Sequence, residues 1–197
     1  MGVEDNNFTK LFTVGIQLGA ILAVVVLYWK KFIAPMRNRG VKSWHFYLKL
    51  LTAVIPALVL GLIFSEKIDA LLESSLTVAI TMIAGGIVLL FIDNVFKTPK
   101  IESEDQISFP KAFIIGLWQC VAMIPGVSRS AASIIGGMQQ SLTRKLAAEF
   151  SFFLAVPTMA AATGYKLLKG YKTLNSEHIK LLAVGNLVAF IVAMLAI

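Results

Sequence analysis

The chain has 197 residues, of which 57% are hydrophobic and only 15% are charged. A water-soluble protein needs more polar surface than this to cover itself, so the composition excludes an ordinary soluble domain. The net charge of +7 is compatible with nucleic-acid binding, but no binding motif and no interleaving of basic and aromatic residues accompanies it. We therefore expect no nucleic acid as a partner and assign the excess of basic residues to loops at a membrane surface.

Six stretches of the chain contain no charged residue. Each is roughly 15–18 residues long, close to the ~20 residues that a straight helix needs to cross a bilayer. They are residues 12–29, 50–64, 76–92, 112–128, 150–165 and 181–197. Lipid offers the backbone no hydrogen-bond partner, and the alternation typical of a membrane barrel is missing, so we predict helices. The alternative, a large helical core in a soluble protein, would need amphipathic helices to cover it, and none is left over.

The loops between these stretches indicate which side of the membrane they face. Residues 30–49 contain six basic residues and no acid, which predicts a cytoplasmic position. Residues 65–75 contain three acids and one lysine, so we expect this loop on the outer side.

The stretch at residues 112–128 ends close to Pro125-Gly126, a pair that favours a break in a helix. The segment can span the membrane, or it can enter, turn at this pair and return to the side from which it came. Non-helical backbone at membrane depth is tolerated only where it is buried in protein or lines a cavity, so a turn here would mark a site. The charges of the following loops do not decide between the two courses.

The strongest candidate site follows this break, in the run Pro-Gly-Val-Ser-Arg-Ser-Ala-Ala-Ser-Ile-Ile-Gly-Gly-Met at residues 125–138. An arginine costs on the order of 2.5 kcal/mol or more at the centre of a membrane helix. Arg129 nevertheless stands here, beside the hydroxyls of Ser128, Ser130 and Ser133. A helix start, a guanidinium and three hydroxyls together suit a phosphate group. Alternatively, Arg129 extends to the lipid headgroups while the serines cap a helix, and the residues alone leave both interpretations open.

Two more polar residues and one glycine pair stand out in the apolar stretches. Gln17 either makes a hydrogen bond between helices or lines a site. Glu149 precedes an apolar stretch, where it either caps a helix or serves as a partner for Arg129 or a cation. The Gly-x-x-x-Gly spacing of Gly15 and Gly19 predicts a close approach between two helices.

Three runs of sequence resemble one known family. They are residues 16–25 (Ile-Gln-Leu-Gly-Ala-Ile-Leu-Ala-Val-Val), residues 119–130 (Gln-Cys-Val-Ala-Met-Ile-Pro-Gly-Val-Ser-Arg-Ser) followed by Gly-Gly-Met at 136–138, and residues 148–157 (Ala-Glu-Phe-Ser-Phe-Phe-Leu-Ala-Val-Pro). In this order and spacing they resemble the undecaprenyl-diphosphate phosphatases of the BacA type. The likeness extends through essentially all 197 residues.

The resemblance implies an enzyme of the bacterial plasma (inner) membrane that removes the terminal phosphate from undecaprenyl diphosphate. This reaction recycles the lipid carrier of peptidoglycan synthesis and confers bacitracin resistance. The partner would be a polyprenyl diphosphate lipid in the bilayer, a divalent cation (Mg²⁺ or Ca²⁺) would assist, and a homodimer is left open. We assign catalysis to Arg129, Ser128 and Ser130, and substrate binding to these three and to Ser133, Gln17 and Glu149.

The fold of the resembling family pairs two inverted repeats, each with a re-entrant helical hairpin and three spanning helices. We therefore predict that residues 1–197 form a single all-α membrane domain. It would be a polytopic helical bundle with about five spanning helices and a re-entrant hairpin near residues 110–140, as part of an inverted-repeat architecture.

The sequence also departs from the family pattern. The family begins with a hairpin that carries a Glu-Gly-x-x-Glu-Phe run and a Pro-Val-Ser-Ser-Thr-Gly-His run, and it ends with one more spanning helix. These parts have no counterpart here, so we expect a chain truncated at both ends. Within the matching motif, Ala131 replaces the usual glycine and Ser133 the usual threonine. Two alternatives to hydrolysis therefore stay open, namely a lipid-phosphate transporter or flippase and an inactive partial homologue.

Overall fold

The computed structural model describes residues 7–30, 41–72, 74–96, 98–170 and 174–196. Within these ranges the chain is almost entirely helical, and strand pairing is limited to one isolated bridge. The elements are α1 (Asn7–Gly15), α2 (Gln17–Leu27), α4 (Val41–Leu72), α5 (Ser75–Val95), η1 (Glu104–Gln106), α6 (Phe109–Cys120), η2 (Val121–Met123), α7 (Arg129–Gln139), α8 (Arg144–Gly170) and α9 (Ser176–Ala196). The predicted all-α class is confirmed.

Four of these helices are long and apolar enough to cross a bilayer. The apolar segments of sufficient length are Trp44–Ser65 in α4, Ser75–Ile92 in α5, Arg144–Gly170 in α8 and Ser176–Ala196 in α9. No residue in the apolar windows of α5 and α9 is buried within the protein, which is the property of helices that face lipid. The protein is therefore a polytopic membrane protein, as predicted.

Two shorter apolar segments, Leu11–Leu27 and Phe109–Met123, accompany the four long helices. The first is interrupted at Ile16, where α1 ends and α2 begins. The predicted number of about five spanning helices stays a prediction. The cytoplasmic position expected for the basic loop also stays a prediction, because residues 31–40 lie outside the described ranges.

The chain divides into two compact units. The hairpin unit comprises Val41–Ala155, and the terminal unit comprises Met1–Gly40 together with Val156–Ile197. Helix α8 is continuous, and its first residues belong to the hairpin unit and the rest to the terminal unit. Most of the candidate site residues lie in the hairpin unit, whereas Gln17 lies in the terminal unit.

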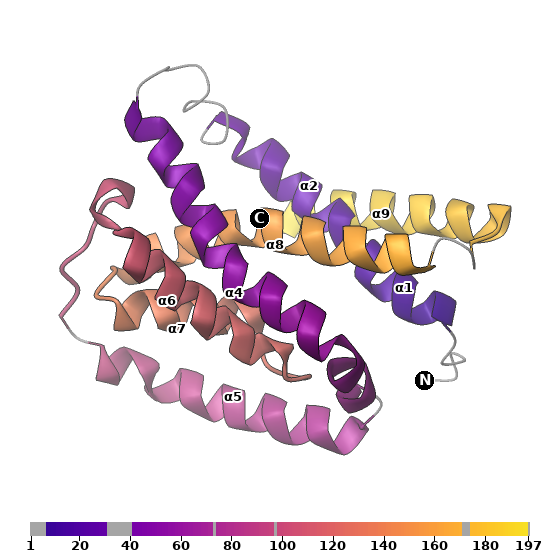
Figure 1. The fold of residues 1–197 in the computed structure, drawn as a ribbon, viewed down its shortest axis with the longest axis horizontal. Helices are drawn as coiled ribbons and strands as arrows, with labels where there is room; N and C mark the ends of the chain where they lie inside the picture. Colours follow the sequence, from indigo (N-terminus) through magenta and orange to yellow (C-terminus); the bar gives the residue numbers. More distant parts are fainter. Residues whose placement is uncertain (1–6, 31–40, 73, 97, 171–173, 197) are drawn as a thin grey trace. The chain divides into compact units, whose positions relative to one another are not determined.

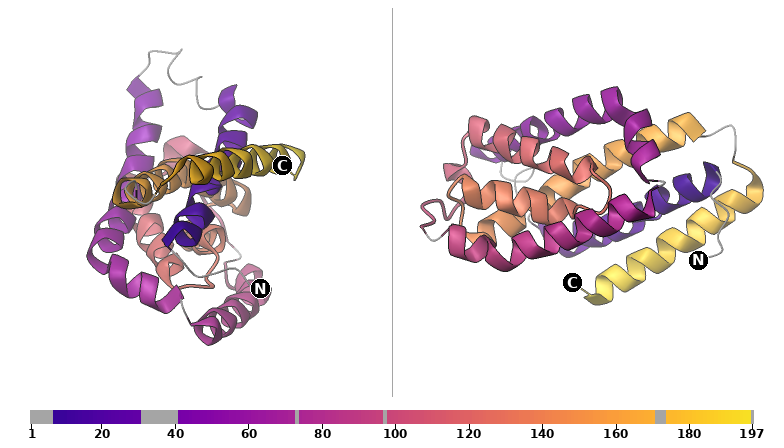
Figure 2. Two further views of the ribbon diagram at one scale, coloured as in Figure 1. Left: turned by 90° about the vertical axis from the view of Figure 1, so that its right-hand side faces the viewer. Right: turned by 90° about the horizontal axis from the view of Figure 1, so that it is seen from below.

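In the hairpin unit, α6 and η2 lead into a turn at residues 124–128, from which α7 returns alongside α6 (Figures 1 and 2). Helix α4 packs along α6. Gly116 allows this approach, because a Cβ at that position would overlap the backbone of Ala53. The core between these helices is apolar, and Ile107, Ile115 and Leu154 are fully buried in it.

The loop before α6 closes the base of the hairpin. Ile101 in this loop forms the isolated bridge with Leu142 in the α7–α8 turn. The Ile101 carbonyl oxygen also accepts from the Thr143 N–H at 2.9 Å. These contacts join the two ends of the hairpin to one another across a separation of about forty residues in the chain.

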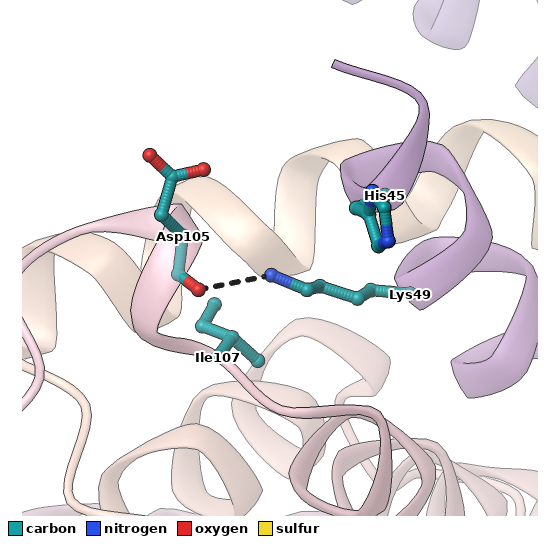
Figure 3. A pocket seen from close by; sticks show the side chains of 4 residues that line it. All are labelled: His45, Lys49, Asp105 and Ile107. Carbon is teal, nitrogen blue, oxygen red and sulfur yellow. Dashed lines mark hydrogen bonds between the residues drawn. The ribbon is translucent and has the colours of Figure 1, made fainter. Parts of the chain in front are cut away.

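Lys49 of α4 holds the same loop from the other side. Its side chain is only 6% exposed, and Nζ donates to the carbonyl oxygens of Glu104 at 3.0 Å and Asp105 at 3.2 Å. Figure 3 shows the ammonium at the Asp105 carbonyl, with the Asp105 carboxylate turned away, beside a cavity of about 320 Å³ that His45 and Ile107 also line. A buried ammonium needs such acceptors, so Lys49 ties the loop to α4.

In the terminal unit, α2 packs along α9. The Gly19 N–H donates to Asn186 Oδ1 at 2.7 Å, and a Cβ at Gly19 would overlap the Asn186 carbonyl group. A Cβ at Gly15 would lie 2.8 Å from a methyl group of Leu182. The close approach predicted from the Gly-x-x-x-Gly spacing is confirmed, and its partner is α9.

Candidate functional site

A sharp turn forms the tip of the hairpin. Gly126 has a φ of 90°, a left-handed conformation that side chains with a Cβ rarely adopt. A Cβ here would also overlap the Thr81 hydroxyl and the Val78 carbonyl oxygen, because the tip lies on α5. The Thr81 hydroxyl lies within hydrogen-bond reach of the Pro125 carbonyl oxygen. The break predicted at Pro125-Gly126 is therefore present, and α5 holds it.

Both arms of this hairpin are too short to cross a membrane. Helix α7 has 11 residues and α6 has 12, so they rise by only ~16 Å and ~18 Å, against ~30 Å for the hydrocarbon core of a bilayer. The chain turns back at the tip, so α6 and α7 form a helical hairpin, as the course that enters and returns requires; its entry into the membrane stays a prediction. The tip carries non-helical backbone and packs on α5, where Pro125 is buried while Ile124 and Ser128 are exposed.

The two arms are braced against each other by side chains that local sequence patterns do not reveal. The Trp118 indole donates to Gln139 Oε1 at 2.6 Å. Lys111 Nζ donates to the Gln140 carbonyl oxygen at 3.0 Å. Gly136 lies directly against Trp118, since a Cβ there would come within 2.6 Å of the Trp118 Cβ atom. The last turns of α7 are therefore held against α6.

Arg129 is the first residue of α7, directly after the tip. Its Nη1 atom is buried and donates to no acceptor in the part of the chain that the structure describes. An unpaired buried donor is costly, and a charged one more so. The residue is therefore placed to receive an acceptor from outside the chain.

The backbone around Arg129 adds further donors. Ser128 is the N-cap of α7: its Oγ accepts from the Ala131 N–H at 3.3 Å, and its carbonyl oxygen accepts from the Ala132 N–H at 3.0 Å. The N–H groups of Arg129 and Ser130 make no hydrogen bond within the described ranges. They are the free donors that every helix start presents, and they favour an anion. Capping, one of the two roles considered for these serines, is thus present at Ser128.

Ser133 lies on the buried side of α7. It is 1% exposed, and its Oγ lies 3.1 Å from the carbonyl oxygens of both Arg129 and Ser130. It also lies 2.7 Å from Oγ of Ser151 on α8, which is 2% exposed. Sequence reasoning did not select Ser151; the available signal was a hydroxyl inside the apolar run at residues 148–157.

The structure places the remaining two candidates, Glu149 and Gln17, in their helices. Glu149 lies in the second turn of α8, because this helix begins at Arg144, six residues before the apolar stretch at residues 150–165. The helix cap considered for Glu149 is therefore wrong. Gln17 is the first residue of α2, in the terminal unit. The substrate contacts predicted for Ser133, Glu149 and Gln17 stay predictions.

A metal site was expected from the family resemblance. Among the residues that can be described, no group of three or more His, Cys, Asp or Glu side chains comes together in a way that could hold a metal ion. The divalent cation expected from the family therefore stays a prediction, and no step of a reaction is assigned to it here.

Comparison with known proteins gives a consistent result over the whole chain. The family model described as "Bacitracin resistance protein BacA" matches residues 1–197. A protein named undecaprenyl-diphosphatase from Flavobacterium psychrophilum is 57% identical over 199 residues, which cover 100% of this chain and 72% of the relative. Proteins of the same name from Flavobacterium johnsoniae and Bdellovibrio bacteriovorus are 54% and 48% identical, with 100% of this chain and 72% and 73% of those relatives covered.

Proposed function

This chain belongs to the BacA family of bacitracin resistance proteins, and we propose that it hydrolyses undecaprenyl diphosphate to undecaprenyl phosphate and inorganic phosphate. The named relatives support the substrate, since those at 48–57% identity are undecaprenyl-diphosphatases. The four long apolar helices support a substrate that resides in the membrane. The reaction would recycle a lipid carrier and thereby counter bacitracin.

One observation in the structure carries this proposal. Arg129 places a buried guanidinium nitrogen, without an acceptor in the described ranges, directly after the tip of the α6–α7 hairpin. A diphosphate is the anion that best suits it, because the planar fork of arginine holds two phosphate oxygens at once and stays charged in a dry site. The free N–H groups of Arg129 and Ser130 extend the same electropositive patch.

The serines beside Arg129 suit the reaction in different ways. Ser128 Oγ accepts from the Ala131 N–H, so its own proton is free to bind a phosphate oxygen. Ser130 follows Arg129 in the first turn of α7 and presents its N–H and its hydroxyl there. Together these groups would stabilise the charge that develops on the transferred phosphate, which is the largest contribution that fixed donors make to such a reaction. A divalent cation stays part of the proposal only as an expectation from the family.

The proposed location is the bacterial plasma (inner) membrane, where this lipid carrier works. Fractionation of a bacterium that expresses the tagged chain should place it with inner-membrane markers, and recovery with the outer membrane would contradict the proposal. A homodimer stays open. The mass of the chain in native mass spectrometry, measured in detergent, decides between one copy and two.

The direct test is phosphate release by the detergent-solubilised chain from undecaprenyl diphosphate. We expect Arg129→Lys to lower kcat/KM by about 10²–10³-fold, because lysine keeps the charge and loses the two-pronged contact. Lys145→Ala, an exposed position on α8, is the matched control and should release phosphate at the unchanged rate. Lipid binding that depends on Arg129 without phosphate release would contradict hydrolysis and favour a lipid-phosphate transporter instead.

A further inference from the structure

Two hydroxyl side chains meet in the core of the hairpin unit, and the proposed reaction does not use either directly. Ser133 of α7 and Ser151 of α8 are 1% and 2% exposed, and their Oγ atoms lie 2.7 Å apart. The surrounding core is apolar, with Phe150 and Leu154 fully buried beside Ser151 in sequence. The Ser151 hydroxyl is under strong constraint in such a place, because it would be unsatisfied without Ser133.

The direction of this hydrogen bond follows from counting protons. Ser133 has one hydroxyl proton, and the carbonyl oxygens of Arg129 and Ser130 both lie 3.1 Å from its Oγ. Ser151 has no hydrogen-bond partner other than Ser133 in the described part of the chain. Both hydroxyls are therefore satisfied when Ser151 donates to Ser133 and Ser133 donates to the two carbonyl oxygens. Bonds linked in this way polarise and strengthen one another.

These linked hydrogen bonds end at Arg129 and Ser130, two residues of the candidate site. The carbonyl groups that Ser133 binds belong to Arg129 and Ser130, whose own N–H groups are free within the described ranges. Nearer the other end of α7, Gly137 packs against Ala147, where an added Cβ would lie 2.8 Å from the Ala147 Cβ atom. Helix α7 is thus fixed on α8 at two points, and the Ser133–Ser151 pair sets the orientation of its first turn.

We propose that Ser151 is a positioning residue: through Ser133 it fixes the first turn of α7, and with it the direction in which Arg129 presents its guanidinium. This inference rests on the proposed function and deepens it. It gives Ser133 a role in holding Arg129 rather than a direct contact with the substrate. A displacement of about 1 Å at a site of this kind is enough to lower a rate by up to ~10²-fold.

The test separates positioning from stability by using three variants of the full chain. Ser151→Ala leaves Ser133 without its donor, and we expect kcat/KM for phosphate release to fall by about 10–100-fold. Ser151→Thr keeps the hydroxyl and should retain most of the activity. The double variant Ser133→Ala/Ser151→Ala removes both partners, so thermal stability should return toward that of the wild type while kcat/KM stays low.

A second readout does not depend on catalysis. Amide hydrogen exchange at Ala131 and Ala132, whose N–H groups bond to Ser128, should become faster in Ser151→Ala and in the double variant, and stay unchanged in Ser151→Thr. The proposal is overturned if Ser151→Ala has wild-type exchange at these amides, or if activity in all three variants merely follows the melting temperature. Should the wild-type chain release no phosphate at all, the proposed function fails, and the exchange measurement still decides whether Ser151 holds the first turn of α7.

Discussion

At the scale of single residues, Arg129 shows how a site for an anion can oppose stability. Its Nη1 atom is buried and lacks an acceptor in the ranges described. Leaving such a donor unpaired costs ~1–3 kcal/mol or more, and the cost is removed when an anion binds. Residues held in this way are typical of functional sites, where stability is lower than the fold alone would allow.

This balance gives a prediction for the substrate-free chain. Arg129→Met removes the buried charge and keeps much of the side-chain volume, so we expect the melting temperature in detergent to rise, by the equivalent of ~1–3 kcal/mol. The same variant should lose phosphate release. Lys145→Met, at an exposed position near the start of α8, serves as the control and should change stability little. A clear fall in the melting temperature of Arg129→Met would show that Arg129 supports the fold rather than a ligand.

Arg129 and its capping serine could be recognised from the sequence because their signal is local. A charged residue in an apolar stretch, directly after Pro125-Gly126, is unusual without any knowledge of the fold. Ser151 could not be recognised, because its partner Ser133 is 18 residues away and only the packing of α7 on α8 brings the two together. The role of a residue in the middle of a helix depends on which face is buried, and an apolar helix gives no pattern from which to read that face.

At the scale of elements, the conformation of the hairpin tip depends on its own residues and on contacts with residues far away in the sequence. The turn itself follows from the chemistry of proline and glycine, and it was predictable. The packing of the turn on α5, through Thr81 and Val78, could not be predicted, because these residues are more than forty positions away in the chain. The first residue of α8 was predicted too late in the chain, for a different reason. Polar residues such as Arg144 and Lys145 extend a helix beyond its apolar stretch, so the stretch marks the membrane segment and not the helix.

Gly126 offers a test of the tip as an element. Gly126→Ala forces a Cβ into the left-handed conformation, which costs ~1–2 kcal/mol, and into the space that Thr81 and Val78 occupy. We expect a lower melting temperature and a loss of phosphate release, because the first turn of α7 is displaced. Gly85→Ala in α5 is the matched control: nothing lies within 4 Å of its added Cβ, and alanine favours a helix. Equal behaviour of the two variants would argue against a role of the tip in placing Arg129.

At the scale of the whole molecule, composition and the six uncharged stretches were sufficient for the all-α membrane class. Lipid leaves few other solutions for such a chain. The stretches could not reveal that residues 12–29 break at Ile16, or that residues 112–128 turn back at the tip. The turn at the tip follows from Pro125-Gly126 and is held by its contacts with α5, and apolar length reveals neither. Apolar length alone cannot distinguish a helix that crosses the membrane from one that enters and returns.

The most direct test of the central claim is a phosphorus NMR time course of undecaprenyl diphosphate incubated with the purified chain. If the chain hydrolyses the diphosphate with the help of Arg129, the two diphosphate signals disappear while one phosphomonoester and one inorganic phosphate signal rise in equal amounts. Arg129→Lys should almost abolish this conversion. A diphosphate that stays intact with the wild-type chain, or that is converted equally fast by Arg129→Lys, would contradict the claim.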